Sequence, residues 1–143
     1  MFDRDHIQNI LSRFFNAFDA KNWEALSSML NDTVKCDYSD LRGVVELISA
    51  NEYVQRRIDA LTPLKTQHII ANLEIYPTGE MINCYFSMLI YRKRENNFFN
   101  THATYHMSLV ENNNELKISY IKQTVLWNDG DPSLHSGISN VSD

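Results

Sequence analysis

The hydrophobic pattern of this chain changes its period near residue 67, and no other feature of the sequence constrains the fold as strongly. Before that point, apolar residues recur at the three- and four-residue spacing of a helix face; after it, they alternate as in strands. Residues 4–20 therefore predict a long amphipathic helix, whose first turn Asp3 or Asp5 can cap. Its apolar stripe consists of Ile7, Ile10, Leu11, Phe14, Phe15 and Phe18.

Two further helices are predicted before the change of period. Asn22 can cap a short one, and Ser49 with Glu52 forms the capping box of another, which Pro63 ends. A run of strands follows, separated by turns rich in Asn, Gly and Pro. The strands are expected at about residues 67–76, 81–93, 98–111 and 116–127.

Three helices followed by consecutive strands are typical of an α+β domain. We expect a cone-shaped, curled antiparallel β-sheet packed around the N-terminal helices, which buries the stripe of the long helix and leaves a cavity at the open end. The length of 143 residues fits one domain, over residues 1–130. Residues 131–143, rich in Gly, Ser, Asn and Asp, are interpreted as a C-terminal tail.

Composition excludes several classes of function. A net charge of −5 argues against nucleic acid, which needs a clustered positive field. The single basic run, residues 92–94, ends a strand and is interpreted as a solvated rim. The acidic N-terminus and the lack of a long apolar run predict a cytoplasmic protein without a membrane segment. Cys36 and Cys84 are expected to be buried thiols rather than a disulfide or a metal pair.

Asp19, His68 and Tyr38 are candidates for proton transfer. Asp19 lies in the last turn of the long helix, where its charge opposes the helix dipole. It is an exposed turn residue, a residue that helps to cap the second helix, or a buried carboxylate that orients a histidine. His68 opens a strand. It is either a strand-end residue bonded to a backbone carbonyl or a residue that faces a cavity. Residues 33–38 alternate in a way that turns Tyr38 inward and Asp37 outward.

The strand that carries His102 has one polar face. His102, Thr104 and His106 share that face, which must meet either bulk water or a polar cavity, and we favour the cavity. The two histidines stand about 13 Å apart at the rise of a strand, too far to bind one metal ion together. No phosphate-binding loop or dinucleotide motif occurs in the sequence, and we expect neither a metal nor a cofactor.

Three segments and the closing residues together resemble a known family. Residues 18–26, 36–39, 67–70 and 124–127 are similar to segments of the nuclear transport factor 2-like superfamily, specifically its SnoaL-like and scytalone dehydratase-like branch. The resemblance covers about residues 5–130. It implies the cone-shaped fold described above.

By position, the resemblance assigns Asp19, Tyr38, His68 and His102 to the catalytic set of a dehydratase. It implies elimination of water from a cyclic β-hydroxy ketone or a related hydrophobic small molecule. A His102–Asp19 pair, with His68 nearby, would move the protons, and Tyr38 would polarise the carbonyl. The family has a second tyrosine where this chain has Phe18. The expected pocket residues are Phe14, Phe18, Thr104, His106 and Trp127.

Two other readings stay open. A ketosteroid isomerase- or cyclase-like enzyme would use Asp37 as base, but Asp37 is expected to face outward, and Phe14 stands roughly where the isomerase has its oxyanion tyrosine. A ligand-binding or assembly module of the same fold would need no contact between His102 and Asp19.

Self-association is also expected. Both faces of the strand at residues 81–93 are largely apolar, and the family forms dimers or trimers, so we expect a homo-dimer or homo-trimer.

Overall fold

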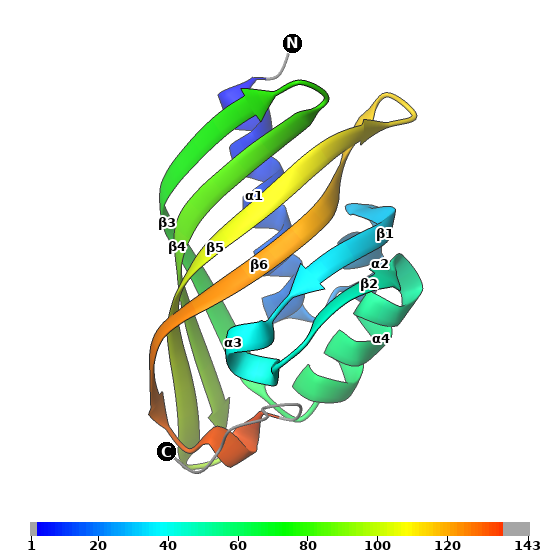
Figure 1. Cartoon of the computed structure of the whole chain (residues 1–143). Coiled ribbons are helices and arrows are strands. Elements are labelled where there is room, and N and C mark those ends of the chain that lie inside the picture. Colours follow the sequence, from blue (N-terminus) through cyan, green and yellow to red (C-terminus); the bar gives the residue numbers. More distant parts are fainter. Residues whose placement is uncertain (1–2, 136–143) are drawn as a thin grey trace.

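The long first helix lies across one face of a curved six-stranded sheet (Figure 1). The computed structural model describes residues 3–135, with the backbone alone at residues 41 and 42. The helices are α1 (Arg4–Ala20), α2 (Trp23–Ser28), α3 (Ser39–Arg42), α4 (Ala50–Leu61) and the short 3-10 helix η1 (Pro132–Leu134). The strands are β1 (Leu30–Asp37), β2 (Val45–Ser49), β3 (Lys65–Thr78), β4 (Met81–Arg94), β5 (Asn97–Asn112) and β6 (Glu115–Gly130).

The sheet is mostly an antiparallel meander. Its strand order is β2-β1-β6-β5-β4-β3, and the four strands from β3 to β6 pair with their chain neighbours. This confirms the predicted α+β class and the curled sheet. Strand β1 joins the other edge of the meander by pairing parallel with β6, and β2 then pairs antiparallel with β1. Neither this parallel pairing nor β2 and α3 were predicted from the sequence.

Helix boundaries follow the predicted capping residues. The side chain of Asp3 accepts the backbone N–H of Asp5 and starts α1 at Arg4. Ser49 accepts the N–H of Glu52 at the start of α4, and Asn22 caps α2 in the same way. The apolar stripe of α1 is buried against the sheet, as the spacing predicted.

The turn between β5 and β6 sets the register of the residues next to it, and the register shifts farther along, at His102/Ala103 and Ser108/Leu109. The turn consists of Asn113 and Asn114, whose φ angles are 54° and 65°. Two successive left-handed residues make a type I′ turn, the type that matches the twist of adjacent antiparallel strands. Asparagine tolerates this conformation better than other non-glycine residues.

Strand β3, at the edge of the sheet, contains a bulge. Ala71 pairs with Ser87 and Glu74 pairs with Tyr85, which leaves two residues of β3 opposite a single residue of β4. Within the bulge Asn72 adopts a left-handed conformation with φ of 57°. The guanidinium of Arg4 in α1 donates a hydrogen bond to the carbonyl of Leu73 at 3.1 Å. Helix α1 is thereby attached to the irregular part of the edge.

The end of the chain is only partly described. Strand β6 extends to Gly130, and η1 follows within the predicted tail, whose residues 136–143 lie outside the described part. No helix in residues 3–135 is long and apolar enough to cross a membrane. Cys36 and Cys84 are both buried, as predicted.

Candidate functional site

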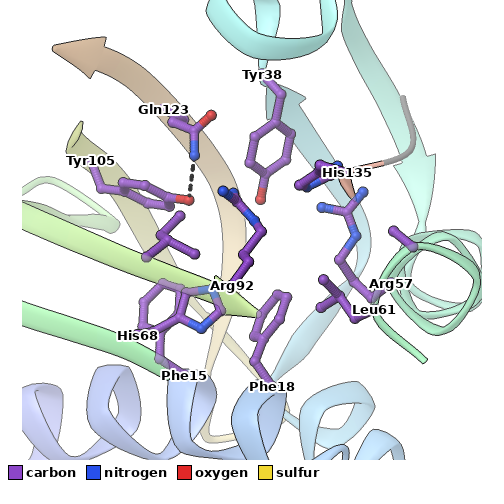
Figure 2. A pocket seen from close by; sticks show the side chains of 12 residues that line it. Phe15, Phe18, Tyr38, Arg57, Leu61, His68, Arg92, Tyr105, Gln123 and His135 are labelled. Atoms are coloured by element: carbon purple, nitrogen blue, oxygen red, sulfur yellow. Dashed lines mark hydrogen bonds between the residues drawn. The ribbon is translucent and has the colours of Figure 1, made fainter. Parts of the chain in front are cut away.

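A cavity lies where the C-terminal end of α1 meets the inner face of the sheet (Figure 2). Its volume is about 30 Å³, room for one or two water molecules, so a larger ligand requires the lining side chains to move apart. Residues from α1, α4 and all four strands of the meander line it, together with one residue just after β1 and one just after η1. They are Phe15, Phe18, Tyr38, Arg57, Ala60, Leu61, His68, Ile90, Arg92, Tyr105, Gln123 and His135.

Asp19 and His68 form a tightly held pair beside this cavity. The Oδ1 atom of Asp19 lies 2.7 Å from Nδ1 of His68, and Oδ2 accepts the backbone N–H of His68 at 2.8 Å. Thr66, two residues earlier in β3, donates its hydroxyl to Oδ1 at 3.0 Å. The sequence left three roles open for Asp19, and these contacts favour the carboxylate that orients a histidine.

The pairing fixes which nitrogen of His68 carries the proton. A carboxylate only accepts hydrogen bonds, so Nδ1 is the protonated nitrogen and Nε2 keeps its lone pair in the neutral ring. Burial lowers the pKa of His68, and the hydrogen bond that His68 donates to Asp19 opposes this shift only in part. His68 is therefore a neutral imidazole near pH 7, the form that can accept a proton.

Aromatic rings hold the imidazole in place. The ring of Phe15 stacks on His68 with centroids 5.5 Å apart, and Phe18 lies against it at 5.1 Å. Both phenylalanines come from α1, the helix that also carries Asp19. The apolar stripe of α1 therefore positions the histidine as well as filling the core.

Tyr38 faces the cavity, as the alternation in β1 predicted, and it has a second phenol beside it. Its hydroxyl lies 2.9 Å from the hydroxyl of Tyr53 in α4. Burial raises the pKa of Tyr38 and of Tyr53, so both stay protonated and can donate hydrogen bonds at neutral pH. Tyr53 was not identified from the sequence, although it lies on the buried stripe of its helix.

Two buried arginines reach the same space. Arg57 comes from α4 and Arg92 from β4, and their side chains are 8% and 3% exposed. The sequence interpretation of residues 92–94 as a solvated rim is wrong for Arg92. The alternation of β4 contained the signal, because Arg92 continues the even-numbered inward positions that end in Met88 and Ile90. Arg57 similarly lies one helical turn after Tyr53, at the spacing of a buried stripe.

Gln123 and Tyr105 form the wall contributed by β5 and β6. Nε2 of Gln123 donates to the hydroxyl of Tyr105 at 2.9 Å. The Oε1 atom of Gln123 is buried without a hydrogen-bond partner in the part of the chain that the structure describes. An acceptor in this position can take a donor from a bound molecule.

His102 does not meet Asp19, which corrects the pairing expected from the sequence. The inward face of β5 carries Ala103 and Tyr105, so His102 lies on the opposite, outer face. Its Nε2 atom is 3.3 Å from a carboxylate oxygen of Asp129, and its ring stacks on Trp127 at 4.2 Å. The polar face of this strand meets the outside of the sheet rather than the cavity.

The other expected pocket residues divide in a similar way. Thr104 and His106 line a separate open hollow on the outer face, and Trp127 is 54% exposed there. Phe14 is fully buried in the core behind Phe18, whose ring lies 5.2 Å from it, and only Phe18 of the five expected pocket residues lines the cavity.

Cys36 points into the core, and Asp37 lies on the other face of β1. Asp37 accepts hydrogen bonds from Ser39, and these lower its pKa. This outward position removes the candidate base of the isomerase reading. Within residues 3–135, no three His, Cys, Asp or Glu side chains are grouped so that they could hold a metal ion.

Comparison with known proteins agrees with this architecture. Residues 1–122 match the model of the SnoaL-like domain. A protein from Kribbella flavida has a similar structure, with 14% identity, a TM-score of 0.86 and coverage of 92% of this chain and 95% of that one. No curated protein sequence matches the chain significantly.

Two similar structures have names that denote enzymes. A candidate scytalone dehydratase from Novosphingobium aromaticivorans is 12% identical, with a TM-score of 0.74 and coverage of 86% and 83% of the two chains. A hexachlorocyclohexane dehydrochlorinase from Novosphingobium barchaimii is 16% identical, with a TM-score of 0.74 and coverage of 98% and 94%. These likenesses show the fold. The match over most of the sequence shows the family: the chain belongs to the SnoaL-like domains of the nuclear transport factor 2-like superfamily.

Proposed function

We propose that this protein is a cofactor-independent lyase of the dehydratase type, acting on a cyclic β-hydroxy ketone or a related small molecule. The observation that carries the proposal is the Asp19–His68 pair, with its neutral imidazole at a cavity that also contains the Tyr38 hydroxyl. This arrangement supplies a base and an electrophilic hydrogen-bond donor at one cavity. The names of two structurally similar proteins, a dehydratase and a dehydrochlorinase, denote eliminations as well.

The proposed reaction begins with proton abstraction. Nε2 of His68 takes the proton from the carbon next to the substrate carbonyl, and Asp19 stabilises the imidazolium that forms. The electron pair moves to the carbonyl oxygen, which receives a hydrogen bond from Tyr38 as negative charge develops there. When the carbon–oxygen bond at the β-position breaks, the same Nε2–H returns its proton to the leaving hydroxyl. Water departs and neutral His68 is restored, which requires elimination from one face of the substrate.

Tyr53 supplies the hydroxyl that Phe18 lacks. The family's second tyrosine precedes the aspartate, and this chain has a phenyl ring there. The hydroxyl of Tyr53, 2.9 Å from Tyr38, restores a pair of phenols from a different helix. If Tyr53 donates to Tyr38, the proton of Tyr38 is available to the substrate carbonyl.

Comparison of two histidine variants tests the assignment. We expect His68→Ala to lower the rate of water elimination on the order of 10²–10⁴-fold, the usual contribution of a positioned acid–base group. His102→Ala should stay close to the wild type, because His102 lies on the outer face of β5. The reaction would be followed by absorbance on a set of cyclic β-hydroxy ketones. Loss of turnover in His102→Ala with full turnover in His68→Ala would refute the assignment.

We also propose that the protein forms a dimer or trimer through the outer face of the sheet. That face exposes apolar side chains, including Tyr85 (40% exposed), Leu126 (56%) and Trp127 (54%). Light scattering coupled to size-exclusion chromatography measures the mass directly. A monomer of 16.7 kDa at high protein concentration would contradict this proposal.

A further inference from the structure

We propose that Arg57 and Arg92 bind the carboxylate of a small organic acid in the cavity, and that the substrate is therefore an anionic molecule. The inference names the substrate class of the proposed lyase and, as a statement about turnover, rests on that function. The binding it predicts can be measured whether or not the protein is catalytic.

Arg57 is a buried cation that forms no ion pair with any residue of 3–135. Its guanidinium lies over the rings of Tyr38 and Tyr53, at 5.3 and 5.0 Å from their centroids. Its Nε atom is buried and has no acceptor in residues 3–135. Stacking holds the planar group in place but does not satisfy the Nε–H, and a buried N–H is costly to leave without an acceptor. The missing partner is a hydrogen-bond acceptor.

Arg92 is a second buried cation on the same cavity. One of its Nη atoms donates to the hydroxyl of Thr101 at 2.8 Å and lies 3.5 Å from the carbonyl of Phe99. Both partners are neutral, so the charge itself is not balanced. Burial, together with repulsion from Arg57, lowers the pKa of Arg92 to about 10, and the group stays charged at pH 7. In Figure 2 the side chains of Arg92 and Arg57 both extend into the lined space.

The local charge balance points to an anion. No Asp or Glu of the described residues forms an ion pair with Arg57 or Arg92. The carboxylate of Asp19 is already occupied by His68 and Thr66. Two positive charges in a buried site are stabilised when an anion leaves water and binds beside them. The planar guanidinium group of an arginine can donate to both oxygens of a carboxylate.

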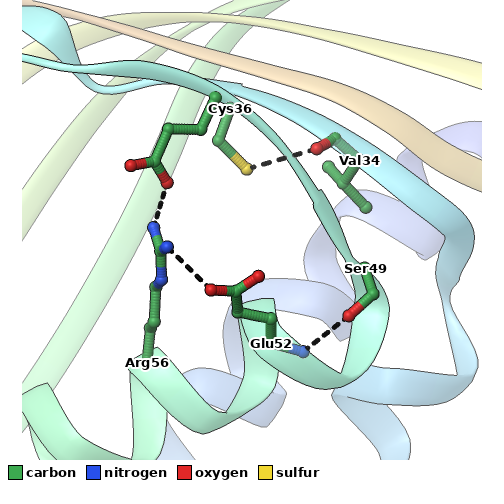
Figure 3. A network of polar contacts seen from close by, with 6 residues as sticks. Val34, Cys36, Ser49, Glu52 and Arg56 are labelled. Carbon is green, nitrogen blue, oxygen red and sulfur yellow. Dashed lines mark hydrogen bonds and ion pairs between the residues drawn. The ribbon is translucent and has the colours of Figure 1, made fainter.

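The neighbouring Arg56 shows what a satisfied arginine looks like in this helix. It lies next to Arg57 in the sequence but on the solvent side of α4, where it pairs with Glu46 and with Glu52 (Figure 3). The chain therefore provides carboxylate partners for an arginine at the surface and none in residues 3–135 for the two in the cavity. Arg56 is also a matched control for substitution.

The remaining lining indicates the rest of the ligand. Phe15, Phe18, Leu61 and Ile90 give the cavity apolar walls, against which a ring can pack once these side chains move apart. The unpartnered Oε1 of Gln123 can accept a hydroxyl. The expected ligand is thus a ring-bearing organic acid, and a hydroxyl group on it would add to the affinity.

Calorimetric titration of three acids against their amides tests the inference. The probes are benzoate, cinnamate and 2-naphthoate, each paired with its amide, which has nearly the same shape without the charge. We expect at least one acid to bind on the order of 10-fold more tightly than its amide. Arg57→Gln and Arg92→Gln should each weaken acid binding about 10- to 100-fold and leave amide binding nearly unchanged, while Arg56→Gln should have little effect.

Three results would overturn the inference: no acid binds better than its amide, neither cavity variant weakens acid binding, or inorganic phosphate binds more tightly than every acid. If Arg92→Gln does not fold by circular dichroism, Arg92→Lys replaces it, and Arg57→Gln provides an independent test. Two measurements separate the two proposals: acid binding by His68→Ala, and turnover by the wild type. If the variant still binds the acids and the wild type shows no turnover, the anion site stands and the lyase is refuted.

Discussion

Thr66 donates its hydroxyl to the same oxygen of Asp19 that accepts the Nδ1–H of His68, at distances of 3.0 and 2.7 Å. The other carboxylate oxygen accepts the backbone N–H of His68 at 2.8 Å. Three donors from one short stretch of β3 thus hold a carboxylate at the last turn of α1, where the helix dipole is unfavourable for it. The geometry of the base is set by the fold before any substrate binds.

Asp19→Asn should change the tautomer of His68 while keeping the shape of the side chain at position 19. An amide can present an N–H to Nδ1, which then carries no proton, so the ring takes the other tautomer and Nε2 no longer accepts. We expect elimination to slow on the order of 10²–10⁴-fold. Long-range ¹H–¹⁵N spectra of the imidazole should show an Nδ1–H tautomer in the wild type and its loss in the variant. An unchanged tautomer would contradict the assigned role.

The titration of His68 should be visible both in its NMR spectrum and in the pH dependence of the free energy of unfolding. Since burial lowers its pKa below the ordinary 6.5, the unfolded chain binds more protons than the folded one in the window just below pH 6.5. The free energy of unfolding should therefore rise with pH through that window and level off above it. Urea denaturation of the wild type and His68→Gln at several pH values isolates the contribution. A midpoint above 6.5 in a histidine NMR titration would contradict the expected direction.

The two phenols make separable predictions. Tyr38→Phe should slow elimination on the order of 10²–10³-fold, because it removes the donor to the developing oxyanion. Tyr53→Phe keeps that donor and should act mainly on stability, lowering the free energy of unfolding by about 1 kcal/mol through loss of the hydrogen bond. Kinetics and thermal unfolding of both variants and of the double variant distinguish the roles. Equal loss of turnover in the two single variants would show that the hydroxyls act together on the substrate.

The Asn113–Asn114 turn offers a test of the fold that does not touch the cavity. Asn114→Gly should be neutral or slightly stabilising, because glycine adopts a φ of 65° without steric cost. Asn114→Val should lower the free energy of unfolding by about 1–2 kcal/mol, since a β-branched residue is strained in that conformation. Chemical denaturation of both variants measures the difference. Equal stability of the two would argue against the type I′ turn.

Local patterns were sufficient to predict most of the fold. The stripe on α1 and the cap at Asp3 located that helix, and the alternation of β3 to β6 located the meander to within a few residues. Strand β2 and helix α3 were missed because five and four residues carry too little periodicity. The parallel pairing of β1 with β6 depends on contacts far apart in sequence, which no local pattern encodes.

The site was predicted in part, and the error on His102 has a specific cause. Alternation separates two faces of a strand but does not say which one is inside. We placed the polar face of β5 in the cavity, whereas the structure buries the face with Ala103 and Tyr105 and turns His102 outward. The polar side chains of the cavity instead occupy positions on the buried faces of helices and strands, among apolar residues. Arg92 continues a row of buried apolar residues in β4, but it also begins the basic run 92–94 at the end of the strand, and that run favoured the solvated interpretation.

The bulge in β3 has a consequence for how copies of the chain can meet. As an edge strand, β3 would otherwise offer an unbroken row of backbone groups to the edge of another sheet, a common route to aggregation. At Asn72 and Leu73 the ladder is interrupted, and the carbonyl of Leu73 is already bonded to Arg4. Strand-by-strand extension through this edge is therefore disfavoured, which leaves the outer face of the sheet and the β2 edge as surfaces through which copies can associate.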